Sequence, residues 1–187
     1  MDARFAGPWP DIRPLVAAEL DAYLAAVAAI DPALPTRCAP WTVRDVTTHL
    51  AATFERFVAM LSQGRRGDLT PPFAPEDMDA ENLRAVRAYT RDPEAALREE
   101  CERFLALASD PDEVMPHQRG PIPVGVQQLF GLGDLAVHHD DVAVAAGRSY
   151  APPPEVVSAL VASYRRLGWW DDADPPEWRS FVSERGT

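Results

Sequence analysis

Three side chains of types that bind divalent metals lie on the apolar faces of two segments with helical periodicity. His49 comes three residues after Val46 and eight before Phe57, so a helix would turn its imidazole inward. Asp134 and His138 are four residues apart, a spacing that places both side chains on one face of a helix. Two neutral imidazoles and one carboxylate suit Zn²⁺ or a similar cation and leave a coordination position for water or substrate. These three residues therefore form the candidate metal site.

The spacing also allows structural explanations for these residues. A helical Asp–His pair four residues apart is often a hydrogen-bonded surface pair, and an inward histidine is more often a hydrogen-bonded core residue than a ligand. Asp141 is a candidate to orient His138 through a hydrogen bond, as metal-bound histidines usually require, or it lies on the helix surface. His139 is expected at the core edge or in solvent. His117, in a loop near Arg119, is expected to be exposed rather than to line a pocket mouth.

The elements that must hold these side chains follow from apolar residues at helical spacing, interrupted by proline and glycine. Thr42 and Asp45 are typical of a helix N-terminus, and Gly147 is typical of a C-terminal cap. Asp92 and Pro93 are expected to divide or bend one helical region. The predicted helices cover residues 11–30, 42–63, 80–108, 124–146 and 155–167.

Four main helices joined by one long crossover predict an all-α four-helix bundle with a short additional C-terminal helix. Gly64 is expected to end the second helix, because residues 64–75 hold two glycines and three prolines and must form an irregular crossover. Residues 110–123 are expected to form another loop. We expect one domain over residues 1–168 and a tail over residues 169–187, which has no period. Bundles of this kind place their ligand sites between facing helices.

Composition argues against several kinds of partner. The chain has 18 basic and 29 acidic residues, a net charge of -11, and no basic stripe interleaved with aromatics, so nucleic acid is not expected. Its apolar stretches fall well short of the ~20 residues that cross a bilayer, and residues 1–10 do not resemble a secretory signal. Cys38 and Cys101 are expected to stay reduced in a cytoplasmic protein. The sequence leaves open whether the chain is a monomer or a homodimer.

The two segments that carry the candidate ligands resemble the DinB-like superfamily. Residues 41–50 read Trp-Thr-Val-Arg-Asp-Val-Thr-Thr-His-Leu, and residues 134–143 read Asp-Leu-Ala-Val-His-His-Asp-Asp-Val-Ala. Together with Gly147, they are similar to the mycothiol-dependent maleylpyruvate isomerase branch of actinobacteria. The resemblance covers the order and spacing of the main helices over residues 11–147. Asn82 also lies where these relatives often carry an asparagine.

This resemblance implies a bundle with one long crossover and a metal, usually zinc, held by a histidine of the second helix and an acid–histidine pair of the last. Those positions correspond to His49, Asp134 and His138. It also implies a low-molecular-weight thiol, mycothiol in actinobacteria, which binds the metal as thiolate and attacks a small-molecule electrophile. The outcome would be isomerisation of an activated double bond or transfer of the thiol.

Three features depart from the family pattern. Asp134 stands where the isomerase-like members carry glutamate, and His139 and Asp140 replace the glycine and tryptophan of other metal-binding relatives. Full isomerases have an additional C-terminal domain, whereas about 40 residues follow Gly147 here. Strict maleylpyruvate isomerase activity is therefore not expected. The alternatives are a metal- or ligand-binding module without chemistry and an interaction protein whose metal site has decayed.

Overall fold

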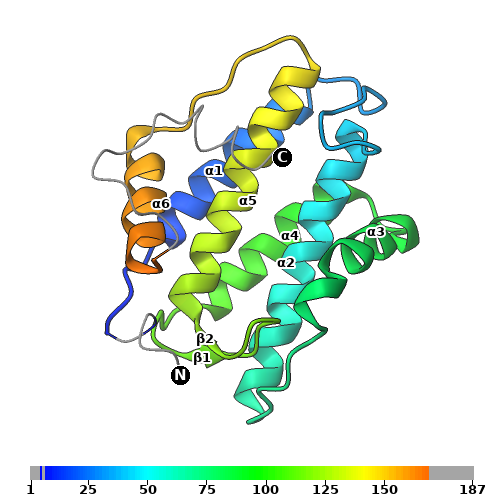
Figure 1. The fold of residues 1–187 in the computed structure, drawn as a ribbon. Coiled ribbons are helices and arrows are strands. Elements are labelled where there is room, and N and C mark those ends of the chain that lie inside the picture. Colours follow the sequence, from blue (N-terminus) through cyan, green and yellow to red (C-terminus); the bar gives the residue numbers. More distant parts are fainter. Residues whose placement is uncertain (1–4, 6, 169–187) are drawn as a thin grey trace.

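The computed structural model describes residue 5 and residues 7–168, and most of this part of the chain is helical (Figure 1). The predicted tail, residues 169–187, lies outside the described residues. In the described part, no helix is both long and apolar enough to cross a membrane. The elements in order are α1 (Arg13–Val27), α2 (Val43–Arg65), η2 (Pro75–Asp77), α3 (Met78–Ala88), α4 (Pro93–Leu107), β1 (Val114–Met115), β2 (Ile122–Pro123), α5 (Val124–Ala145) and α6 (Pro154–Arg166).

The long crossover is needed because α2 and α4 are neighbours that run in the same direction. Arg65, at the end of α2, donates a hydrogen bond to the carbonyl of Leu107, at the end of α4. Near the start of α4, Arg91 pairs with Glu55 of α2. Two parallel helices side by side cannot be joined by a short turn, so residues 66–92 return the chain and carry α3 along the outer side of α2 (Figure 1). The predicted bundle with one crossover is confirmed.

Helix α5 lies against both α1 and α2 in the bundle (Figure 1). It approaches α2 closely at Gly131, where an added Cβ would lie 3.1 Å from the ring of Phe54. Phe54 in turn packs against Phe57 and Phe104, with ring centroids 5.3 and 6.1 Å away, and these aromatic contacts form the centre of the core. Helix α6 covers another side of α5, with Tyr164 as a major buried contact.

The capping residues at the helix ends lie where the sequence predicted them. Thr42 and Asp45 form the predicted capping box of α2, with the Thr42 hydroxyl accepting the Asp45 N–H and the Asp45 carboxylate accepting the Thr42 N–H. The predicted break is also present, since the Asp92 side chain accepts the Ala95 N–H and caps α4. Gly147 has a φ of +69° directly after α5, as expected for a C-terminal cap.

The prediction that Gly64 ends α2 is wrong, because the helix continues to Arg65. Gly64 serves close packing instead: an added Cβ would lie 3.1 Å from both the Pro116 ring and the Val114 carbonyl oxygen. The segment over Gly64 was expected to be a plain loop, yet its Val114–Met115 strand pairs antiparallel with Ile122–Pro123. This short hairpin folds residues 116–121 back toward the bundle.

Candidate active site

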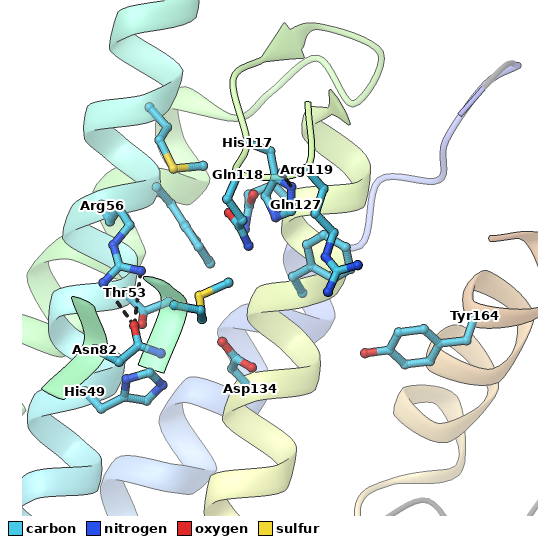
Figure 2. Close-up of a pocket in the computed structure, with 14 residues that line it drawn as sticks. His49, Thr53, Arg56, Asn82, His117, Gln118, Arg119, Gln127, Asp134 and Tyr164 are labelled. Atoms are coloured by element: carbon cyan, nitrogen blue, oxygen red, sulfur yellow. Dashed lines mark hydrogen bonds between the residues drawn. The ribbon is translucent and has the colours of Figure 1, made fainter. Parts of the chain in front are cut away.

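A cavity of about 290 Å³ opens between α2 and α5 (Figure 2). Residues of α2 and α5 form two of its walls, and Asn82 of α3 and Tyr164 of α6 reach it from the sides. The hairpin loop closes one end with His117. A volume of this size suits a small molecule.

His49 is buried on α2 and lines this cavity, as its inward position in the sequence predicted. Its ring lies 4.9 Å from the Trp41 ring and 5.1 Å from the His138 ring, centroid to centroid. Burial, and then the nearby charges of His138 and Arg56, lower the pKa of His49 well below its ordinary value. The imidazole is therefore neutral at physiological pH, which is the form that binds a metal.

Asp134 also lies on α5 at this cavity, and Figure 2 shows its carboxylate pointing inward across from His49. The structure thus brings His49 and Asp134 to one cavity and places the ring of His138 beside that of His49. Two imidazoles and a carboxylate are donor types that suit Zn²⁺. Coordination of one cation by all three residues stays a prediction.

The expected hydrogen bond between His138 and Asp141 is present, with 2.8 Å between Nδ1 and Oδ2. Burial alone would raise the pKa of Asp141, but hydrogen bonds from His138 and its other neighbours outweigh burial and lower that pKa to about 2. A charged carboxylate accepts, so Nδ1 of His138 carries the proton in this hydrogen bond, and the neutral form of the ring has its lone pair on Nε2. This is how a second residue usually orients a metal-binding histidine.

Cys38 and Arg37 complete the surroundings of Asp141. The Cys38 thiol donates to Oδ2 at 3.0 Å, and Arg37 Nε donates to Oδ1 at 2.6 Å. The potential ligand atoms of Cys38, His138 and Asp141 all lie within 4.8 Å of one another. Among the described residues this is the group of metal-binding types that meets that distance, and His49 and Asp134 are not part of it. However, Arg37 already neutralises the carboxylate, and burial followed by the bond to Asp141 raises the pKa of Cys38 to about 12. We interpret this cluster as a network that holds His138 in place.

Arg56 is a cavity residue that the sequence analysis did not single out. Both of its terminal nitrogens donate to Asn82 Oδ1, at 3.2 and 3.1 Å, and so join α2 to α3 (Figure 2). Burial lowers the pKa of Arg56 while the charges of Glu81 and Asp134 raise it, and an arginine starting above 12 stays charged. The signal was available, because Arg56 lies seven residues after His49 and therefore on the same helical face.

The expectation that His117 is an exposed loop residue is wrong. It is buried, lines the cavity and packs against Phe130 with ring centroids 5.4 Å apart. Its Nδ1 accepts the backbone N–H of Arg119 at 3.2 Å, and burial lowers the pKa of His117 to about 4. The cause is the short hairpin, which presses this loop onto α5.

His139 is buried on another side of α5, toward α1. Its Nδ1 lies 2.8 Å from Glu19 Oε1, and its ring stacks on that of Tyr150 at a centroid distance of 3.8 Å. The Tyr150 hydroxyl donates to the same Glu19 oxygen at 2.6 Å. His139 is thus part of the core and not of the cavity wall.

Comparison with known proteins gives a consistent result. Residues 14–143 match the family model described as the mycothiol maleylpyruvate isomerase N-terminal domain. Crystal structures of the mycothiol-dependent maleylpyruvate isomerase and of its histidine-to-alanine mutant are similar in fold. Each has a TM-score of 0.59 and 17% sequence identity, over 87% of this chain and 71% of the other. No curated protein sequence matches this chain.

Proposed function

Since the chain belongs to the mycothiol maleylpyruvate isomerase N-terminal domain family, within the DinB-like branch, we propose that it is a metal-dependent thiol S-transferase or isomerase. It would use a low-molecular-weight thiol such as mycothiol on an electrophilic small molecule. The observation that carries this proposal is the placement of a neutral His49 and of Asp134 in one cavity, beside a His138 ring whose Nδ1 is already bonded.

In this proposal His49, Asp134 and His138 hold a divalent metal, and their donor types favour zinc. When bound, such a metal lowers the pKa of a coordinated thiol and supplies a thiolate at neutral pH. The protein's own contribution is to keep the ligands in the right form and direction. Burial keeps His49 neutral, and Asp141 fixes the tautomer of His138.

Arg56 supplies positive charge to the same cavity. Addition of a thiolate to an activated double bond moves negative charge onto the carbonyl oxygen of the electrophile. A preorganised cation next to that oxygen stabilises the charge as it develops. Asn82 holds the guanidinium in place through two hydrogen bonds. We therefore assign Arg56 the role of stabilising the electrophile during thiol addition.

We place this activity in the cytoplasm. Low-molecular-weight thiols act in reducing compartments, and both Cys38 and Cys101 are free thiols. The cavity lining, rather than the acidic surface, would provide recognition, so the expected partners are the thiol and the electrophile and not a nucleic acid.

The direct test measures metal content and turnover on untagged protein. We expect about one equivalent of zinc in the wild type, and loss of this zinc in His49→Ala and His138→Ala with helical circular dichroism retained. His117→Ala is the matched control for metal content and should keep its zinc, since it removes a cavity histidine that is not an expected ligand. Zinc retained by the double variant His49→Ala/His138→Ala would contradict the metal assignment. Zinc bound without any thiol-dependent turnover would indicate a binding module instead.

A further inference from the structure

Two adjacent glutamines on α5 are both completely buried but differ in their partners. Gln128 is 0% exposed, accepts the Ile12 N–H at 3.3 Å and donates to the Ala108 carbonyl at 2.8 Å. Gln127 is 1% exposed, and its Oε1 accepts no hydrogen bond from any residue that the structure describes. A buried acceptor without a donor costs about 1–3 kcal/mol, so such a residue needs an explanation.

The position of Gln127 suggests that explanation, because its side chain lines the cavity near the hairpin loop (Figure 2). His117 lies at the same end. Since its Nδ1 accepts the Arg119 N–H, the neutral ring carries its own hydrogen on Nε2. This end of the cavity therefore combines an acceptor that lacks a donor with a side chain that can donate. A hydroxyl or amide group both donates and accepts, and it matches this pair.

The distance along α5 restricts which ligand can reach this pair. Gln127 precedes Asp134 by seven residues, which corresponds to about 10 Å along a helix axis. A thiol whose sulfur lies near His49 and Asp134 must therefore extend about 10 Å to place a polar group against Gln127. A short thiol such as N-acetylcysteine is too small to do so.

We propose that Gln127 and His117 form a subsite for a hydroxyl or amide group on the body of the thiol, about 10 Å from its sulfur. The subsite selects extended, hydroxyl-bearing thiols over short ones. The electrophile would then occupy the side of the cavity that Arg56 and Asn82 line. This inference rests on the proposed function for the presence of a thiol. The observation that Gln127 Oε1 lacks a donor at the edge of a cavity does not depend on that function.

Calorimetric titration of the zinc-loaded protein with mycothiol and with N-acetylcysteine tests the subsite. We expect Gln127→Met to weaken mycothiol binding about tenfold and to leave N-acetylcysteine binding unchanged. Methionine has a similar volume and no acceptor in need of a donor, so the melting temperature of the ligand-free variant should equal or exceed that of the wild type. Gln128→Met is the matched control: it should lower the melting temperature and keep the preference for mycothiol.

Four results would overturn the inference. Equal affinity of the wild type for the two thiols, or an unchanged preference in Gln127→Met, would overturn the subsite alone. A marked fall in the melting temperature of ligand-free Gln127→Met would do the same, because it would show that Gln127 has a structural partner. Failure of both thiols to bind the zinc protein would overturn the proposed function and the subsite together.

Discussion

Two neighbouring histidines of α5 face different parts of the molecule and are treated differently there. His139 faces α1, where Glu19 and Tyr150 pair and stack with it inside the core. His138 faces the side of α2, where the hydrogen bond described for it uses Nδ1 and its ring meets His49 edge-on. On the core side Glu19 bonds both His139 and Tyr150, whereas on the α2 side the His138 ring lies against a second imidazole. That difference distinguishes a structural histidine from a candidate ligand more reliably than spacing does.

The most direct test of this difference is to replace each of the two histidines with alanine in turn. His138→Ala should abolish tight zinc binding with little loss of stability, because Arg37 and Cys38 still hydrogen-bond Asp141. His139→Ala should keep the zinc but lower the free energy of unfolding by about 2 kcal/mol, because a buried Glu19 loses a hydrogen-bond partner. Metal analysis and urea denaturation of both variants measure the two effects. The opposite pattern, with zinc lost only in His139→Ala, would reverse the assignment of the two faces.

On the cavity side, the largest effect without loss of metal is expected from Arg56. Arg56→Met should reduce thiol-dependent turnover of an electrophile about 100-fold while zinc content stays unchanged. Arg98→Met is a suitable control, since Arg98 pairs with Asp21 on the outer surface and its loss should not affect turnover. Wild-type turnover in Arg56→Met would remove this arginine from the mechanism.

A third buried histidine adds a pH dependence. The pKa of His117 is lowered to about 4 in the folded chain, against about 6.5 in the unfolded one, so only the unfolded state gains a proton between these values. Its contribution to stability is complete above pH 6.5 and decreases as the pH falls toward 4. At pH 5 the loss should be about 2 kcal/mol relative to pH 7.5. Urea denaturation at both pH values should show a smaller difference in His117→Gln than in wild type, and an equal difference would contradict this origin.

The smallest effect is expected from the hydroxyl that completes the core side. Tyr150→Phe removes the donor to Glu19 but keeps the ring that stacks on His139. We expect a loss of about 1 kcal/mol in the free energy of unfolding, with zinc content and turnover unchanged. Thermal denaturation monitored by circular dichroism would detect it. A change in zinc content would mean that the two faces of α5 are coupled.

Features with local causes could be predicted from the sequence. The capping box of Thr42 and Asp45 and the break at Asp92 depend on neighbouring residues, so their residue types were sufficient. The inward direction of His49 followed from helical periodicity, and the i, i+3 spacing made the bond between Asp141 and His138 foreseeable.

Features that depend on distant contacts could not be predicted in this way. Gly64 stays inside α2 because the hairpin segment passes over it, and no local signal reports that contact. His117 is buried for the same reason. Arg56 shows a different limit. Its helical face could be predicted, but its partner Asn82 lies on α3, within the long crossover. The missing donor of Gln127 could be recognised only once all its neighbours were in place.

Helix α3 contributes Met78 and Asn82 to the cavity, yet none of its residues is fully buried. Substitutions along it would therefore reshape one wall of the cavity at little cost to folding, while the ligand-bearing helices stay unchanged. Under the proposed function, the preference for an electrophile would then change through substitutions on this one outer helix. A screen for altered substrate range would gain most by randomising that helix first, with Asn82 kept because it holds Arg56.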